Sequence, residues 1–204
     1  MTAQTCTLYL VRHGQTQWNI DQTIQGHTDI PLTKIGEQQA YEQQTHLKNI
    51  SFTKIYSSDL IRAHKTAQIL NLERSLAIQT TQTLRERNFG SYQGRPIEEG
   101  RKKLWDLLAN YKEHPHVKAS GVETNEQVIG RSLTFLREVS VAHPGQNILV
   151  VTHGGIMRLI LLHLGYVKEG GFPHNAIQNL AYIQLECDGI DFKVKETFGI
   201  TLHK

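Results

Sequence analysis

Two short runs of consecutive apolar residues predict buried strands. They cover residues 7–11 and 147–152, and polar residues bound each of them. Strands that are apolar on both faces are typical of a parallel sheet covered on both sides. The first run is followed by Arg12, His13 and Gly14, and the second by His153 and two glycines. Because open α/β sheets bind ligands at the carboxyl ends of their strands, the pattern predicts one crevice that contains both histidines.

Helical periodicity predicts two helices and a strand between these runs. Thr33 can cap a helix that extends to about Leu47. Residues 54–57 form a short strand, and Asp59 can cap the helix that follows. That helix carries small and apolar side chains on one face, at Ala63, Ala67 and Leu70.

The second half of the chain predicts three more helices and a hairpin. One helix spans residues 98–111, and a second begins at the capping box formed by Thr124 and Gln127. Residues 156–164 are apolar nearly all round and end at Gly165, as expected for a buried helix. Residues 180–186 and 190–198 flank Asp188-Gly189, a strong hairpin turn signal.

These elements predict an α/β protein of three α/β/α layers. Its central sheet is mostly parallel, with one antiparallel edge hairpin near the C-terminus. At 204 residues we expect a single domain over residues 1–204, interrupted by a lid-like insertion at about residues 92–123. Residues 111–123, within this insertion, are the least regular stretch of the chain.

Composition narrows the class of protein. With 39% hydrophobic residues and a formal charge of +3, the chain is typical of ordinary globular proteins. Its Lys and Arg residues are scattered and do not form the dense stripe of a nucleic-acid groove. It shows no stretch able to span a bilayer and no ordinary signal peptide, and its two cysteines have no metal or redox spacing. We therefore expect a cytoplasmic protein with no nucleic-acid or membrane partner, either monomeric or homodimeric.

The chemistry of the predicted crevice favours a phosphate ligand. Arg12 lies beside His13, and Arg62 lies early in the helix that follows the strand at residues 54–57. Each close arginine–phosphate pair contributes on the order of 4 kcal/mol before desolvation at an effective dielectric constant near 20. The same cations disfavour an imidazolium at His13 and so keep its nitrogen nucleophilic.

Five motifs, in order, resemble those of the histidine phosphatase superfamily, also called the phosphoglycerate mutase-like family. They are Leu10-Val11-Arg12-His13-Gly14-Gln15-Thr16-x-x-Asn19, residues 25–33, residues 57–67, Leu84-Arg85-Glu86-x-x-Phe89-Gly90-x-x-x-Gly94 and Val151-Thr152-His153-Gly154-Gly155. The resemblance covers nearly the whole chain. One departure occurs at the start of the helix at Thr124, where the family usually shows Gly-Gly-Glu-Ser and this chain reads Ser120-Gly121-Val122-Glu123-Thr124.

The resemblance implies a role for each site residue. His13 is the nucleophile that becomes phosphorylated, and Glu86 is the proton donor. A carboxyl beside a phosphate dianion keeps its proton more readily, which suits that role. The groups that hold the transferring phosphoryl group are Arg12, Arg62 and His153. The residues that line the pocket are Asn19, Gln25, Gly26 and Gly154.

The resulting prediction is a metal-independent phosphomonoesterase of the phosphatase branch that acts on a small phosphorylated metabolite and uses no cofactor. Positioning and electrostatics supply most of the catalysis of phosphoryl transfer, so the mechanism needs no Mg²⁺ in principle. His114 and His116 flank a proline, but a pair of histidines without a third ligand is typical of a solvated loop.

Two other functions stay open. A phosphoglycerate mutase would use the same histidine, although the stretch between Gly94 and Gly121 is short for one. A non-catalytic member would bind phosphorylated ligands only, but the chain retains the whole set of expected catalytic residues. The substrate itself is open, with sugar phosphates, phosphoglycerates, nucleoside monophosphates and a cobalamin-pathway nucleotide all compatible.

Overall fold

The two apolar runs lie side by side as parallel neighbours inside one sheet. In this computed structural model, which describes residues 4–99, 121–168, 170–173 and 175–202, the sheet has the order β3-β2-β4-β1-β5-β6. The strands are β1 (Cys6–Arg12), β2 (Phe52–Ser58), β3 (Ile78–Thr81), β4 (Asn147–Thr152), β5 (Ile177–Cys187) and β6 (Phe192–Ile200). Strands β1, β4, β2 and β3 are parallel, while β5 runs antiparallel to both β1 and β6. The predicted mostly parallel sheet with an antiparallel edge hairpin is confirmed. The four-residue strand β3 was not predicted, because it has no apolar run.

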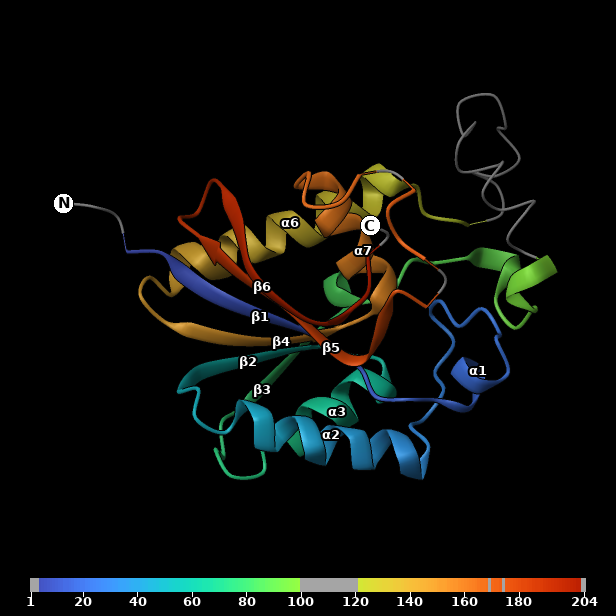
Figure 1. The fold of residues 1–204 in the computed structure, drawn as a ribbon, viewed down its shortest axis with the longest axis horizontal. Helices are drawn as coiled ribbons and strands as arrows, with labels where there is room; N and C mark the ends of the chain where they lie inside the picture. The colour runs from blue at the N-terminus through green and yellow to red at the C-terminus, as the bar shows by residue number, and fades with distance from the viewer. Residues whose placement is uncertain (1–3, 100–120, 169, 174, 203–204) are drawn as a thin grey trace.

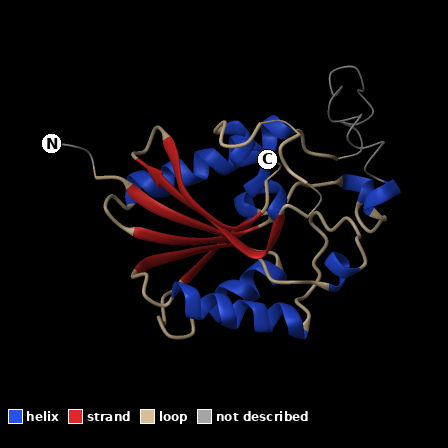
Figure 2. Ribbon diagram, viewed as in Figure 1, coloured by secondary structure: helices blue, strands red, loops and turns tan. Residues whose placement is uncertain are grey.

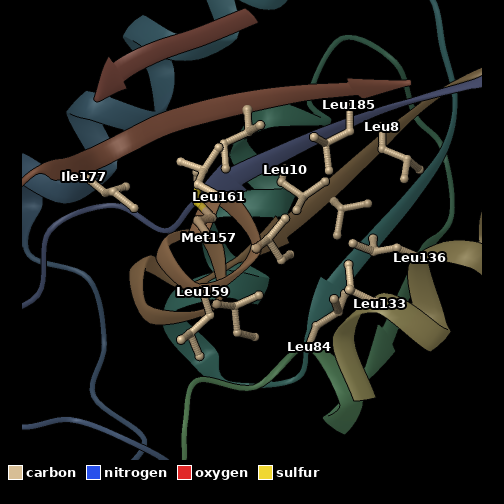
Figure 3. Close-up of a cluster of buried hydrophobic side chains, with 14 of the residues drawn as sticks. Leu8, Leu10, Leu84, Leu133, Leu136, Met157, Leu159, Leu161, Ile177 and Leu185 are labelled. Carbon is tan, nitrogen blue, oxygen red and sulfur yellow. The ribbon is translucent and has the colours of Figure 1, made fainter. Parts of the chain in front are cut away.

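Helices cover both faces of the sheet, as Figures 1 and 2 show. Helices α2 (Lys34–Leu47) and α3 (Ile61–Leu70) lie on one face, and α6 (Asn125–Ala142) and α7 (Gly154–His163) lie on the other. Successive strand residues point to opposite faces. Leu8 and Leu10 therefore join the core under α6 and α7, drawn in Figure 3, whereas Tyr9 and Val11 join the core over α2 and α3.

One predicted helix cap is wrong. Helix α3 has Leu60 at its N-cap, with no side-chain cap of its own, and the Asp59 carboxylate instead accepts two hydrogen bonds from Arg85. The charged partner outcompetes the helix terminus for this carboxylate. Asp29, distant in sequence, accepts a hydrogen bond from the Ile61 amide in its place at 2.7 Å. By contrast, the predicted caps at Thr33 and Thr124 are confirmed.

Several boundaries in the C-terminal half differ in detail from the prediction, among them the start of β5 at Ile177 instead of residue 180. Helix α7 begins at Gly154, two residues early, so that His153 is its N-cap; its end before Gly165, at φ +68°, is as expected. The hairpin turn spans residues 188–191, because the Asp188 carboxylate accepts the amides of Ile190 and Asp191. Strand β6 therefore starts at Phe192.

Short helical turns and the insertion complete the chain. Helix α1 (Gln17–Ile20) and the 3-10 turns η1 (Gln82–Leu84) and η2 (Gly90–Tyr92) lie in loops beyond the carboxyl ends of the parallel strands. The structure describes helical backbone at residues 97–99, where the helix predicted for residues 98–111 begins. The rest of that helix, most of the predicted insertion, and His114 and His116 lie outside the described residues. Among the helices that are described, none combines the length and the apolar character needed to cross a membrane.

Candidate active site

The register of β1 with β4 brings the two histidine motifs together. Arg12 is paired with Thr152, and the His13 amide continues the ladder by donating to the Thr152 carbonyl at 3.0 Å. His13 and His153 are the next residues on their strands, and the centroids of their rings lie 5.1 Å apart. Both side chains are buried, with 3% and 0% exposed. The two histidines predicted to meet at this edge of the sheet are thus neighbouring, buried imidazoles.

The tautomer of His13 follows from one hydrogen bond. Its Nδ1 atom lies 2.7 Å from the Gly14 carbonyl oxygen, which can only accept, so Nδ1 carries the hydrogen. The lone pair is then on Nε2. Burial, and after it the charges of Arg62 and Arg12, holds the pKa of His13 well below its ordinary value. His13 is therefore a neutral imidazole with a nucleophilic Nε2 at neutral pH.

Two arginines, the fully buried Arg62 and the partly buried Arg12, supply positive charge at this site. The Arg62 guanidinium donates to the carbonyls of Thr28 at 2.8 Å and Gly26 at 2.7 Å, and Arg12 Nη1 donates to the Ile177 carbonyl. Burial lowers the pKa of Arg62 to about 10, so it stays protonated at neutral pH. These carbonyl partners orient the two guanidinium groups and do not neutralise the charge of either.

Three buried nitrogens of the site have no hydrogen-bond partner within the described part of the chain. They are Arg12 Nε, Arg62 Nε and His153 Nδ1. An unsatisfied buried polar group costs about 1–3 kcal/mol, and more when it is charged. The oxygens of a phosphoryl group would satisfy such nitrogens, so the arrangement favours a tetrahedral anion.

His153 is oriented by a serine that sequence reasoning did not single out. Its Nε2 atom lies 2.9 Å from Ser58 Oγ, at the end of β2. Burial, followed by the charge of Arg62, holds the pKa of His153 well below its ordinary value. Because β2 is the other parallel neighbour of β4, the fold explains why Ser58 reaches this histidine.

Glu86 reaches the same site through the N-terminus of α7. Its Oε2 accepts the Gly155 amide at 2.9 Å, and its Oε1 accepts the Arg87 amide at 2.8 Å. A Cβ atom at Gly155 would lie only 2.3 Å from Glu86 Oε1. The glycine is thus required for the close approach of the Glu86 carboxyl group to the first turn of α7.

Two of the predicted binding residues, Gly26 and Gly154, lie against the arginines. Gly26, at φ +52°, presents its carbonyl to Arg62, and a Cβ there would be 2.1 Å from Gln93 Oε1. The Gln25 Oε1 atom is buried and lacks a partner among the described residues. A Cβ at Gly154 would lie 3.2 Å from Arg12 Nε, so this glycine gives the guanidinium room.

Asn19, the remaining predicted binding residue, uses its side-chain oxygen for hydrogen bonds within the protein. Asn19 Oδ1 accepts the Thr16 amide at 3.1 Å and closes the capping box of α1. The same oxygen lies 3.4 Å from Asn179 Nδ2, which also donates to the His13 carbonyl at 3.0 Å. A register shift in β5 and the left-handed backbone of Leu180, at φ +59°, accompany this orientation of Asn179. Asn179 had only a weak sequence signal, because neither feature is visible as periodicity.

The chain is similar to known proteins over nearly its whole length. A family model described as the histidine phosphatase superfamily (branch 1) matches residues 8–198. The uncharacterized phosphatase PhoE of Bacillus subtilis (strain 168) is 34% identical, over 90% of this chain and 86% of PhoE. A metal-independent phosphoserine phosphatase of Arabidopsis thaliana is 32% identical, over 87% of this chain and 76% of its own. A phosphoglycerate mutase from Bacillus anthracis str. Sterne has a similar structure, with a TM-score of 0.80 at 27% identity over 97% of this chain and 94% of the mutase.

Proposed function

Since this chain belongs to branch 1 of the histidine phosphatase superfamily, the superfamily that its motifs resemble, we propose that it hydrolyses a small phosphomonoester through a phosphohistidine at His13. The chain is a phosphatase by its family and by the relatives that carry that name. The observation that carries the proposed mechanism is the neutral imidazole of His13, with Nδ1 bound to the Gly14 carbonyl and Nε2 unprotonated. A phosphohistidine forms directly from this state.

The reaction has two in-line displacements. First, His13 Nε2 forms a bond to phosphorus while the ester P–O bond breaks, and protonated Glu86 gives its proton to the leaving oxygen. Water then attacks the phosphohistidine, gives a proton to the Glu86 carboxylate, and releases inorganic phosphate and neutral His13. The unpartnered nitrogens of Arg12, Arg62 and His153 stabilise the equatorial oxygens in both steps.

Metal independence is part of this proposal. The permanent charges of Arg12 and Arg62 occupy the place that a divalent cation takes in many other phosphoryl-transfer sites. The Arabidopsis thaliana relative is itself named a metal-independent phosphoserine phosphatase. In the parts of the chain that the structure describes, no group of three or more metal-ligating side chains occurs.

A phosphoglycerate mutase is the second candidate function. It is favoured by the structural similarity to the Bacillus anthracis mutase, which extends over 97% of this chain. A mutase differs in returning the phosphoryl group from His13 to a bound product instead of to water.

The domain organisation and the location of the protein also belong to the proposal: a single domain with a lid-like insertion at about residues 92–123, and a cytoplasmic location. Cys6 and Cys187 support that location, since both thiols are free although they face each other across β1 and β5.

The deciding experiment is phosphate release from a panel of phosphorylated metabolites in EDTA, for the wild type and His13→Ala. His143→Ala is a matched control, because His143 lies at the opposite end of β4. Release that survives EDTA and is lost only in His13→Ala is the expected result. A coupled assay of 3- to 2-phosphoglycerate conversion detects the mutase, and conversion without net release would overturn hydrolysis as the main reaction. The absence of both activities would point to a ligand-binding role.

A further inference from the structure

The backbone that carries Glu86 is held from outside the pocket by an ion pair. Arg131, in α6, donates from Nη1 to the Thr83 carbonyl at 2.6 Å and from Nη2 to the Glu86 carbonyl at 3.1 Å. Glu123 accepts the Asn88 amide at 2.7 Å on the other side of Glu86. The segment of residues 83–88 is thus bound at three backbone groups by two charged side chains.

Glu123 and Arg131 also hold each other in a fixed geometry. Arg131 Nε donates to Glu123 Oε1 at 2.8 Å, and Nη2 donates to Oε2 at 2.9 Å. Only 20% of the arginine side chain and 22% of the glutamate side chain are exposed. Although burial opposes it, the bonds from Arg131 and Asn88 hold the pKa of Glu123 below its ordinary value. A lysine has no planar fork and cannot make this set of hydrogen bonds.

His27 gives the Glu86 carbonyl a second donor. Its Nε2 atom lies 2.8 Å from that oxygen and 3.9 Å from Glu123 Oε2. His27 stands between Gly26 and Thr28, whose carbonyls hold Arg62. The Glu86 backbone is therefore tied both to α6 and to the loop that orients a phosphate-binding arginine.

We propose that the Glu123–Arg131 pair, supported by His27, positions Glu86 for proton transfer and so determines activity toward esters with poor leaving groups. The inference rests on the proposed function and adds positioning residues to it. The pair binds the backbone of residues 83–88 and makes no hydrogen bond to the nitrogens proposed to hold the phosphoryl group. Its loss should impair protonation of the leaving oxygen while phosphoryl capture at His13 is retained.

The test compares phosphate esters that differ in their need for an acid. An alkyl ester such as phosphoserine needs a proton on its leaving oxygen, whereas 2,4-dinitrophenyl phosphate leaves as a stable anion. For Arg131→Lys and Glu123→Gln we expect kcat/KM on the alkyl ester to fall about 10- to 100-fold, in line with the usual effect of an orienting residue. We expect kcat/KM on the dinitrophenyl ester, and the inhibition constant of inorganic phosphate, to stay near the wild-type values.

Two comparisons separate positioning from a merely structural role. Arg137→Lys is the matched control, because Arg137 lies in the same helix and donates to the Ile190 carbonyl, away from residues 83–88. In a Glu86→Gln background, Arg131→Lys should have no further effect on the alkyl ester, since no acid remains to be positioned. Thermal unfolding of each variant reports on the fold.

The possible results separate the positioning role of Glu123 and Arg131 from the proposed phosphatase function. Selective loss on poor leaving groups, absent from Arg137→Lys and from the Glu86→Gln background, supports the positioning pair. An equal loss on both esters, or no loss, overturns it while the proposed phosphatase stands. A wild type that releases phosphate from neither ester, or an unaffected His13→Ala variant, overturns the proposed function itself.

Discussion

Substitution of Gly155 by alanine tests the geometry of the site most directly. Gly155 lies in the first turn of α7, and its amide donates to the Glu86 carboxylate at 2.9 Å. A Cβ at this position would be 2.3 Å from Oε1, 2.9 Å from the carboxyl carbon and 3.0 Å from Oε2 of Glu86. The contact atoms belong to the proposed proton donor itself, so the substitution acts on the chemistry before it acts on the fold.

The size of the effect follows from the distances. Ordinary van der Waals contact begins at 3.4 Å, so Glu86 Oε1 must move by about 1.1 Å. A shift of that size disrupts the hydrogen bond that Oε1 accepts from the Arg87 amide, and it moves the whole carboxyl group relative to the Gly155 amide. A misplacement of about 1 Å costs on the order of 100-fold in rate. Alanine in a helix is about 1 kcal/mol more favourable than glycine, so stability should not fall by a comparable amount.

The assay is kcat/KM on an alkyl phosphate together with thermal unfolding. Gly155→Ala should lose about 100-fold in kcat/KM and unfold near the wild-type temperature. Gly130→Ala is the matched control, because Gly130 lies in α6 and a Cβ there has nothing within 4 Å. Wild-type kcat/KM in Gly155→Ala would refute the close packing of Glu86 against α7, and with it the assigned proton donor.

Three further predictions concern the charged and polar groups of the site. Burial, and after it the charge of Arg62, depresses the pKa of His13 and of His153, so these histidines bind protons in the unfolded chain at a higher pH than in the folded protein. The free energy of unfolding should therefore fall by about 1.4 kcal/mol per histidine between about pH 7.5 and 5.5. In urea titrations, His13→Asn should remove the contribution of one histidine to this fall. Arg62→Lys loses the planar fork and the hydrogen bonds to the carbonyls of Gly26 and Thr28. It should lower kcat/KM by about 100-fold on esters with good and with poor leaving groups alike. A loss on only one class of ester would contradict a phosphate-binding role. Ser58→Ala removes the partner of His153 Nε2 and should cost about 1–3 kcal/mol in chemical denaturation; an unchanged midpoint would show that this hydrogen bond is not made.

The sequence by itself determined the elements and the ingredients of the site. Apolar runs on both faces identified β1 and β4, local caps identified the starts of α2 and α6, and the glycine turn identified the hairpin. His13 and His153 could be predicted to meet because both follow buried strands. These features depend on residues a few positions apart, where backbone propensity and hydrophobic burial act directly.

Only the tertiary structure determined which of these groups contact one another and how their side chains are oriented. The pairing of Arg12 with Thr152 makes the histidines neighbours, and the approach of Glu86 to Gly155 joins segments with no local signal for one another. The predicted cap at Asp59 was wrong because Arg85, which is distant in the sequence, binds its carboxylate. A hydrogen bond or ion pair between remote segments forms only after the layers have packed, and periodicity along the chain does not encode which remote partner a side chain will meet.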